Sequence, residues 1–201
     1  MADIGESPTG YTEYVEYIVP ERRIHLLMVA LTVGLAEVFF PGAVVEFYNT
    51  ASQGFINFVV VSLEEILFIG GMIFVHECIH YLVAYKQGYD PQAGIRLTDS
   101  FYVIKEPSPY IIVLNEHISR RHNIGMLIAP LLVIDFVALV GLLPIFPAYV
   151  AYFAKIALVV NTASSMQDVY NVFRLLTMDE DTRFINIMED EVRSFYCKPV
   201  N

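Results

Sequence analysis

Charge is scarce in this chain. Charged residues make up 17% of the 201 residues, whereas soluble domains usually carry about 25%, so the composition argues against an ordinary cytosolic enzyme. Two cysteines cannot build a disulfide scaffold. Basic residues are also few: 12 Lys and Arg stand against 22 Asp and Glu, and the net charge is −10. This acidic balance argues against a nucleic-acid partner, which needs a basic surface.

The chain is instead rich in apolar sequence. Hydrophobic residues account for 56% of it, and the mean hydropathy is +0.52. Four apolar blocks reach the roughly 20 residues that a helix needs to cross the hydrocarbon core of a membrane. They lie at about 24–45, 55–85, 124–146 and 148–176. The sequence therefore predicts an all-α membrane protein, a bundle of about four transmembrane helices.

The distribution of Lys and Arg predicts the orientation of this bundle, because cytoplasmic segments carry an excess of both. All but one of the 12 lie before the first block, between the second and third blocks, or at and beyond the end of the fourth. The exception is Lys155, which lies toward the other side. We therefore expect both termini and the long middle segment to be cytoplasmic.

The segment between the second and third blocks does not follow a helical pattern. Short runs of β-type residues alternate there with turn signals such as Pro107-Ser108-Pro109. They predict a small cytoplasmic β-element at about 93–116, within a membrane-embedded domain at 1–177. The acidic cytoplasmic tail at 178–201 contains interleaved apolar residues, which fit an amphipathic surface helix.

Polar residues inside the second block form the pattern H-E-x-x-H, with His76, Glu77 and His80. Residues four apart lie on one face of a helix, so both imidazoles can bind one Zn²⁺, a metal that readily takes His nitrogen. Glu77 follows the first ligand and can act as a general base toward a metal-bound water. Cys78 is turned about 200° from His76, and we do not expect it to bind the metal.

A buried polar cluster without a metal is the alternative interpretation of this motif. Ionisable side chains within a membrane span are costly, however, and they are functional by default. We therefore favour a metal site. His117 and His122 belong to the basic approach to the third block, and we interpret them as cytoplasmic surface residues.

A catalytic zinc site normally has three protein ligands and one water, so another segment must supply the third. In the fourth block, Asn161, Ser165 and Asp168 occupy helical positions i, i+4 and i+7, which form one face. His80 and Asp168 each precede a basic residue of the cytoplasmic side by six positions. This matching depth predicts Asp168 as the third ligand. The alternative is an acidic residue at a helix end near the membrane interface.

These features together resemble a known family. An H-E-x-x-H motif in an apolar helix, a β-containing segment and two further blocks with an Asn…Asp pair in the last are similar to the site-2 proteases. Those proteins are intramembrane zinc metalloproteases, and the likeness, over about residues 70–175, is closest to small zincin peptidases of bacteria and archaea. The resemblance implies that both motif histidines and Asp168 bind zinc, that Glu77 is catalytic, and that Asn161 is an auxiliary polar group. It also implies a prokaryotic plasma membrane.

Other acidic residues lie in or beside the apolar blocks. Glu65 precedes His76 by eleven residues. This spacing is close to three helical turns, so both side chains point the same way, and Glu65 as an auxiliary residue could line a polar path toward the metal. The equal alternative places Glu64 and Glu65 at the outer interface. Glu37 and Asp135 lie inside the first and third blocks, and the sequence does not say with what they pair.

Three functions follow from these observations. The leading hypothesis is an intramembrane zinc metalloendopeptidase that acts on membrane-protein or peptide substrates within the lipid bilayer. Ser164-Ser165 stands where the site-2 protease motif usually has proline, and a proteolytically silent zinc-binding protein with a regulatory or partner-binding role is the alternative. The third hypothesis is a small cation transporter that uses the acidic residues of the apolar blocks.

Overall fold

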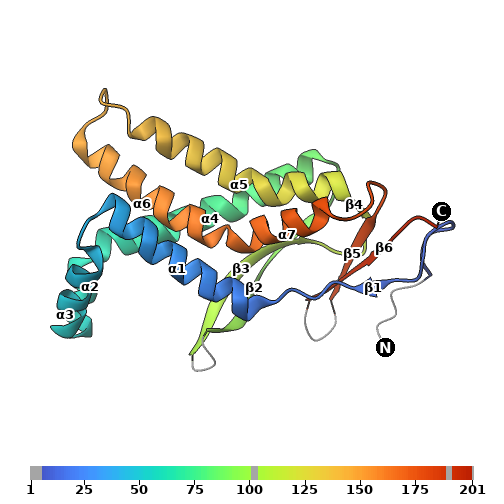
Figure 1. The fold of residues 1–201 in the computed structure, drawn as a ribbon, viewed down its shortest axis with the longest axis horizontal. Coiled ribbons are helices and arrows are strands. Elements are labelled where there is room, and N and C mark those ends of the chain that lie inside the picture. Colours follow the sequence, from blue (N-terminus) through green and yellow to red (C-terminus); the bar gives the residue numbers. More distant parts are fainter. Residues whose placement is uncertain (1–5, 101–103, 189–191, 201) are drawn as a thin grey trace. The chain divides into compact units, whose positions relative to one another are not determined.

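The computed structural model describes residues 6–100, 104–188 and 192–200. These residues form seven helices and six strands. The helices are α1 (Glu21–Phe39), α2 (Ala43–Ser52), α3 (Phe55–Val61), α4 (Leu63–Lys86), α5 (Arg120–Gly141), α6 (Ala148–Ser164) and α7 (Met166–Leu176). The strands are β1 (Val15–Glu16), β2 (Pro91–Ser100), β3 (Ile104–Val113), β4 (Ile118–Ser119), β5 (Arg183–Met188) and β6 (Val192–Cys197). The prediction of an all-α bundle is therefore wrong, because the described part of the chain is mixed α/β with two antiparallel sheets (Figure 1).

The first apolar block contains a sharp corner. Helices α1 and α2 meet at 106°, across Pro41, which has no N–H to donate, and Gly42, whose φ of +86° is readily adopted by glycine. The carboxylate oxygens of Glu37 accept hydrogen bonds from the backbone N–H groups of Gly42 and Val44, each at 2.9 Å. Glu37 therefore satisfies donors at the start of α2 that have no partner within the helix.

Two other blocks are interrupted as well. The second is divided at Ser62 into α3 and α4, and the predicted helix over 148–176 is divided at Ser165 into α6 and α7. Among the described residues, α4 and α5 are each long and apolar enough to cross a membrane, and an 18-residue stretch of each has a mean hydropathy of 1.8 and 2.4, respectively. The bent pair α1–α2 adds a third candidate, whereas α6 is shorter.

The chain folds into two compact units, and helices α4 and α5 contribute to both. One unit contains a four-stranded antiparallel sheet in the order β1-β6-β5-β4. The end of α4, the start of α5 and helix α7 also belong to this unit. They pack with the strands into one apolar core, formed by Ala84, Val113, Ile118, Met126, Leu175 and Phe184.

The tail is not the amphipathic helix expected from its sequence but the hairpin β5–β6. Phe195 and Cys197 are buried and Tyr196 between them is more exposed, which is the period of two that a strand requires. Strand β6 also pairs with β1, so that Val15 lies opposite Tyr196. Strand stability depends on such cross-strand neighbours, and a partner more than 170 positions away cannot be recognised from the local pattern.

A second, two-stranded sheet lies between α4 and α5 in the sequence. Strands β2 and β3 pair without a bulge, from Pro91 opposite Val113 to Ser100 opposite Ile104. They occupy most of the segment, about 93–116, in which the sequence predicts a β-element. Among the described strands, each of the two pairs only with the other, although the Val113 carbonyl at the end of β3 accepts a hydrogen bond from the Asn186 side chain of β5.

The other compact unit is helical. Helices α1 and α6 lie side by side in it (Figure 1). The ring of Phe40 contacts Tyr152 edge-on at 5.5 Å between centroids, and Phe68 contacts Phe153 at 4.8 Å. The Tyr152 hydroxyl donates a hydrogen bond of 2.7 Å to Oε1 of Glu65. Helix α6 is thereby held to the start of α4 by both aromatic and polar contacts.

The adjacent residues Leu175 and Leu176 provide a test of the core around α7. Leu175 is 1% exposed and Leu176 is 55% exposed. We expect Leu175→Ala to lower the free energy of unfolding by about 2–5 kcal/mol, because it removes buried methyl groups and leaves a cavity. Leu176→Ala should change it far less. Thermal unfolding in detergent, followed by circular dichroism, measures both, and equal losses would contradict the assignment of this core.

Candidate metal centre

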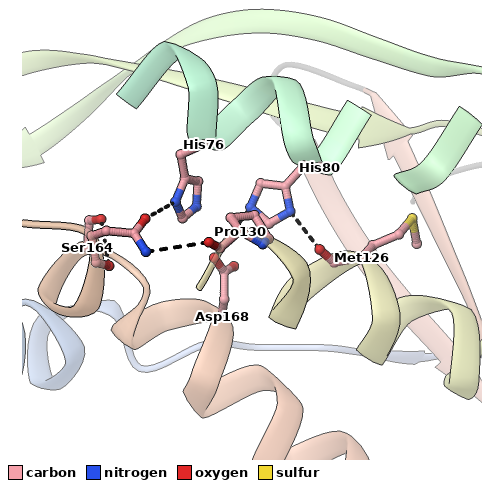
Figure 2. A network of polar contacts seen from close by, with 7 residues as sticks. His76, His80, Met126, Pro130, Ser164 and Asp168 are labelled. Atoms are coloured by element: carbon pink, nitrogen blue, oxygen red, sulfur yellow. Dashed lines mark hydrogen bonds and ion pairs between the residues drawn. The ribbon is translucent and has the colours of Figure 1, made fainter. Parts of the chain in front are cut away.

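Helix α4 positions the two histidines of the H-E-x-x-H motif. It runs unbroken from Leu63 to Lys86 over 24 residues without a proline, and an 18-residue stretch of it has mean hydropathy 1.8. His76 and His80 therefore lie one turn apart on one face, and Figure 2 shows both imidazoles pointing to the same side of the helix. His76 is 8% exposed, so this face of α4 is covered at the motif.

Asp168 contributes a carboxylate to the same group. Its Oδ2 lies 3.4 Å from Nε2 of His80, and one ligand atom from each of His76, His80 and Asp168 lies within 4.8 Å of the other two. Ligands of a tetrahedral zinc at about 2.0–2.2 Å are about 3.3–3.5 Å apart. The His80–Asp168 spacing already matches a shared ion, and two imidazoles with one carboxylate are a donor set that zinc accepts. The residues therefore fit the metal.

The break at Ser165 determines where Asp168 stands in its helix. Asp168 lies in the first turn of α7. The partial positive charge at a helix N-terminus stabilises a carboxylate in the first turn. The interruption that the sequence did not predict thus places Asp168 at the start of a helix, a favourable position for a carboxylate side chain.

The imidazole of His80 is oriented by a backbone carbonyl group that has no hydrogen-bond donor within its own helix because of a proline. Nδ1 of His80 lies 2.8 Å from the carbonyl oxygen of Met126 (Figure 2). In a regular helix this oxygen would accept from the N–H four residues later, but that residue is Pro130, which has no N–H. A carbonyl can only accept, so Nδ1 of His80 carries the proton. In the neutral imidazole the lone pair is then on Nε2, the nitrogen beside Asp168, where a metal can accept it.

His76 is fixed in the same way by a side chain. Its Nδ1 lies 2.9 Å from Oδ1 of Asn161 on α6. Asn161 is 1% exposed, and its Nδ2 donates to Oδ1 of Asp135 at 2.8 Å. Nδ1 of His76 donates to the amide oxygen, and Nε2 keeps its lone pair. The auxiliary polar residue predicted in the fourth block therefore contacts the first motif histidine directly.

Glu77 follows His76 on α4 and is partly buried. Helical geometry turns it about 100° from His76, away from the line through the two imidazoles. Glu77 therefore lies beside the two histidine ligands, and we do not expect it to be the third ligand. Its role as the general base stays a prediction.

Two further predicted residues lie outside the metal group. The Ser165 side chain is completely buried, and its hydroxyl has no hydrogen-bond partner among the described residues. Glu65 bonds Tyr152 and stands eleven residues before His76, which is about 16 Å along the helix. At this distance Glu65 cannot touch a metal held by the motif.

The remaining histidines and acids of interest have other partners. His117 contacts the Tyr14 hydroxyl at 2.5 Å, and His122 contacts the Tyr89 hydroxyl at 2.8 Å. Glu37 caps α2, as described above. Glu37 is hydrogen-bonded in a helix cap and Glu65 accepts a hydrogen bond from Tyr152. These contacts give little support to the hypothesis of a cation transporter that uses the two acids.

The sequence pointed to Asn161 but not to the other groups that orient the imidazoles, which are Met126, Pro130 and Asp135. Met126 contributes only its backbone, so its side chain carries no signal. Pro130 does carry one, because a proline within an otherwise regular apolar helix frees the carbonyl four residues earlier. That signal indicates a free acceptor but not the histidine that uses it.

Comparison with protein families matches residues 69–183 to the family described as putative zincin peptidase. No curated protein and no solved structure matches the chain. The matched segment includes the whole metal group and the general-base candidate beside it. Zinc is the cofactor that this family implies, and the residues present fit it. The match covers more than half of the chain, which therefore belongs to this zincin peptidase family.

Proposed function

We propose that this protein is an intramembrane zinc metalloendopeptidase of the site-2 protease type. The observation that carries the proposal is the gathering of His76, His80 and Asp168 on and beside an apolar helix long enough to cross a membrane. Family membership supports the peptidase chemistry. The location within the bilayer rests on the character of the helices.

The exposed surfaces of α4 and α5 support a lipid environment. Only 11% of the apolar window of α4 and 22% of that of α5 is buried within the protein. Large apolar side chains such as Leu67, Phe74, Leu132 and Phe136 are each more than 60% exposed. Contiguous apolar exposure on this scale is unfavourable in water and natural in hydrocarbon. We infer a multi-pass protein of a prokaryotic plasma membrane with both termini in the cytoplasm.

In the proposed reaction, His76, His80 and Asp168 hold the zinc ion. Zinc, when bound, supplies Lewis acidity that makes a water molecule nucleophilic near neutral pH. Glu77 accepts a proton from the attacking water and passes it to the leaving amine as the peptide bond breaks. His76 is 8% exposed and is therefore largely shielded from bulk water, whereas the side chains of His80 and Asp168 are 14% and 18% exposed.

The substrate is proposed to be a membrane-embedded segment that enters as an extended strand. A helical peptide bond is already hydrogen-bonded, so the substrate must unwind locally before water can attack its carbonyl. Among the described strands, β2 and β3 pair only with each other, so their outer edges have no strand partner except at the Val113 end of β3, where Asn186 of β5 contacts it. An unwound substrate adding to one of these edges would gain main-chain hydrogen bonds there.

Zinc content tests the ligand set. We expect about one zinc per chain in purified wild-type protein and a strong loss in His76→Ala, His80→Ala and Asp168→Ala, because each removes one of three protein ligands. The measurement is metal analysis by mass spectrometry after gel filtration. Asp179→Ala, which changes an exposed acid outside the group, is the matched control and should keep its zinc. Undiminished zinc in Asp168→Ala would point to another ligand, with His117 and His122 tested first.

Glu77→Gln tests the chemistry. The substitution keeps the shape of the side chain and removes the base, so we expect zinc to be retained and cleavage of a membrane-embedded test substrate to fall about 10²–10⁴-fold. Glu64→Gln, an exposed glutamate near the start of the same helix, should cleave as the wild type does. Equal rates for wild type and Glu77→Gln would refute the peptidase mechanism. Zinc binding without cleavage of any substrate in a panel would favour the silent zinc-binding alternative.

Cysteine labelling in cells tests the orientation. A cysteine at Ser52, in the segment between the first two blocks that has no Lys or Arg, should react with a membrane-impermeant maleimide added outside. A cysteine at Glu180, whose side chain is 91% exposed, should react only after the membrane is opened. The unsubstituted chain provides the background from its own two cysteines. The reverse labelling pattern would overturn the orientation.

A further inference from the structure

A chain of hydrogen bonds leads from His76 away from the metal group to an acid on α5. Nδ1 of His76 bonds Oδ1 of Asn161 at 2.9 Å, and Nδ2 of Asn161 donates to Oδ1 of Asp135 at 2.8 Å. The second carboxylate oxygen of Asp135 accepts from the Thr162 hydroxyl, also at 2.8 Å. Both oxygens of the acid are therefore engaged by donors from α6.

We propose that Asp135 is a positioning residue that selects, through Asn161, the tautomer of His76 that binds zinc. This inference deepens the proposed metal site and rests on His76 being one of its ligands. Nothing in it requires Asp135 to touch the metal or the substrate.

The proposed role of Asp135 depends on which end of the Asn161 amide faces His76. The two ends of an asparagine amide are nearly equal in shape, so only their partners distinguish them. One end faces the Asp135 carboxylate at 2.8 Å and the backbone carbonyl of Pro130 at 3.5 Å. The carbonyl oxygen of Pro130 can only accept a hydrogen bond, and the contact to Oδ1 of Asp135 is likewise one in which Asn161 donates, so the end that faces them is the NH₂ group. The amide oxygen is then obliged to face His76.

The orientation of the amide determines the chemistry of the imidazole. An oxygen opposite Nδ1 requires a proton on Nδ1, which leaves the Nε2 lone pair for the metal. The reversed amide would present N–H to Nδ1 and so favour the proton on Nε2, the nitrogen that must bind zinc. Without Asp135, the weaker bond to Pro130 alone would oppose that reversal.

The apolar surroundings of Asp135 make an acidic side chain costly at this position, which supports a specific role for it. It lies within a 22-residue helix that contains an 18-residue stretch of mean hydropathy 2.4, where an acidic side chain is costly unless its hydrogen bonds are satisfied. Its neighbour Ile134 is buried at 8% exposure. An apolar residue at 135 would remove the cost of burying the acid but would also release the Asn161 amide.

Zinc affinity is the first measurement. We expect Asp135→Leu to weaken zinc binding about 10–100-fold, the usual effect of losing a residue that orients a metal ligand. Affinity is determined by competition with a chromogenic chelator in detergent. Asp135→Asn keeps an oxygen that can accept from Asn161 and should lose much less. Ile134→Ala removes a buried side chain of the same helix outside the hydrogen-bond chain, and it should leave the zinc affinity of the folded protein unchanged.

The tautomer of His76 is the second measurement, because a purely structural role of Asp135 would not change it. In metal-free protein labelled with ¹⁵N-histidine, the His76 signals, assigned by their loss in His76→Gln, should report a proton on Nδ1. Asp135→Leu should shift them toward the other tautomer. The wild-type protein alone tests the proposal even if Asp135→Leu does not fold. A proton on Nε2 of wild-type His76 would overturn the proposal.

Other results also overturn the proposal. Wild-type zinc affinity in Asp135→Leu would show that the acid does not position His76, and an equal loss in Ile134→Ala would reduce its role to packing. An equal loss in Asp135→Asn and Asp135→Leu would show that a hydrogen-bond acceptor is not what matters. If wild-type protein binds no zinc, the proposed function fails, whereas the tautomer measurement still decides the role of Asp135.

Discussion

The candidate site depends on one constraint of imidazole chemistry. A neutral histidine offers a lone pair to a metal on one nitrogen only when the proton is held on the other. Here both histidines of α4 have an acceptor opposite Nδ1, Asn161 for His76 and the Met126 carbonyl for His80. In apolar surroundings each acceptor also satisfies a donor that would otherwise be costly to bury. The same two bonds therefore stabilise the structure and prepare the ligands.

Interruptions of regular helix provide much of what the site uses. Pro130 frees the carbonyl that orients His80, and the break at Ser165 places Asp168 in the first turn of α7. The corner at Gly42 brings the backbone donors of α2 to Glu37. Each interruption exposes backbone groups that a continuous helix would have paired internally. Nearby polar side chains then form hydrogen bonds with those backbone groups or are stabilised by their partial charges.

The fold could be predicted from the sequence in part. Long apolar runs indicated α4 and α5. An apolar segment that crosses a membrane forms a helix because a helix satisfies nearly all of its backbone hydrogen bonds internally. The sheet β1-β6-β5-β4 was missed, since its stability depends on pairing the start of the chain with its end, as in Val15 opposite Tyr196. The apolar residues of β5 and β6 fit a helical face equally well when read alone. Only their partners decide between the two.

For the site, the sequence by itself determined the chemistry of α4. His76, Glu77 and His80 have fixed relations on any helix, and their cost in an apolar run marks them as functional. The matching depth of Asp168 also indicated the third ligand, but tertiary structure alone decided its actual distance from His80 and the bonds of Asp135 and Met126 that orient the imidazoles. The reason is physical. Spacing along one helix follows from backbone geometry, whereas a hydrogen bond between helices depends on packing that no local pattern encodes.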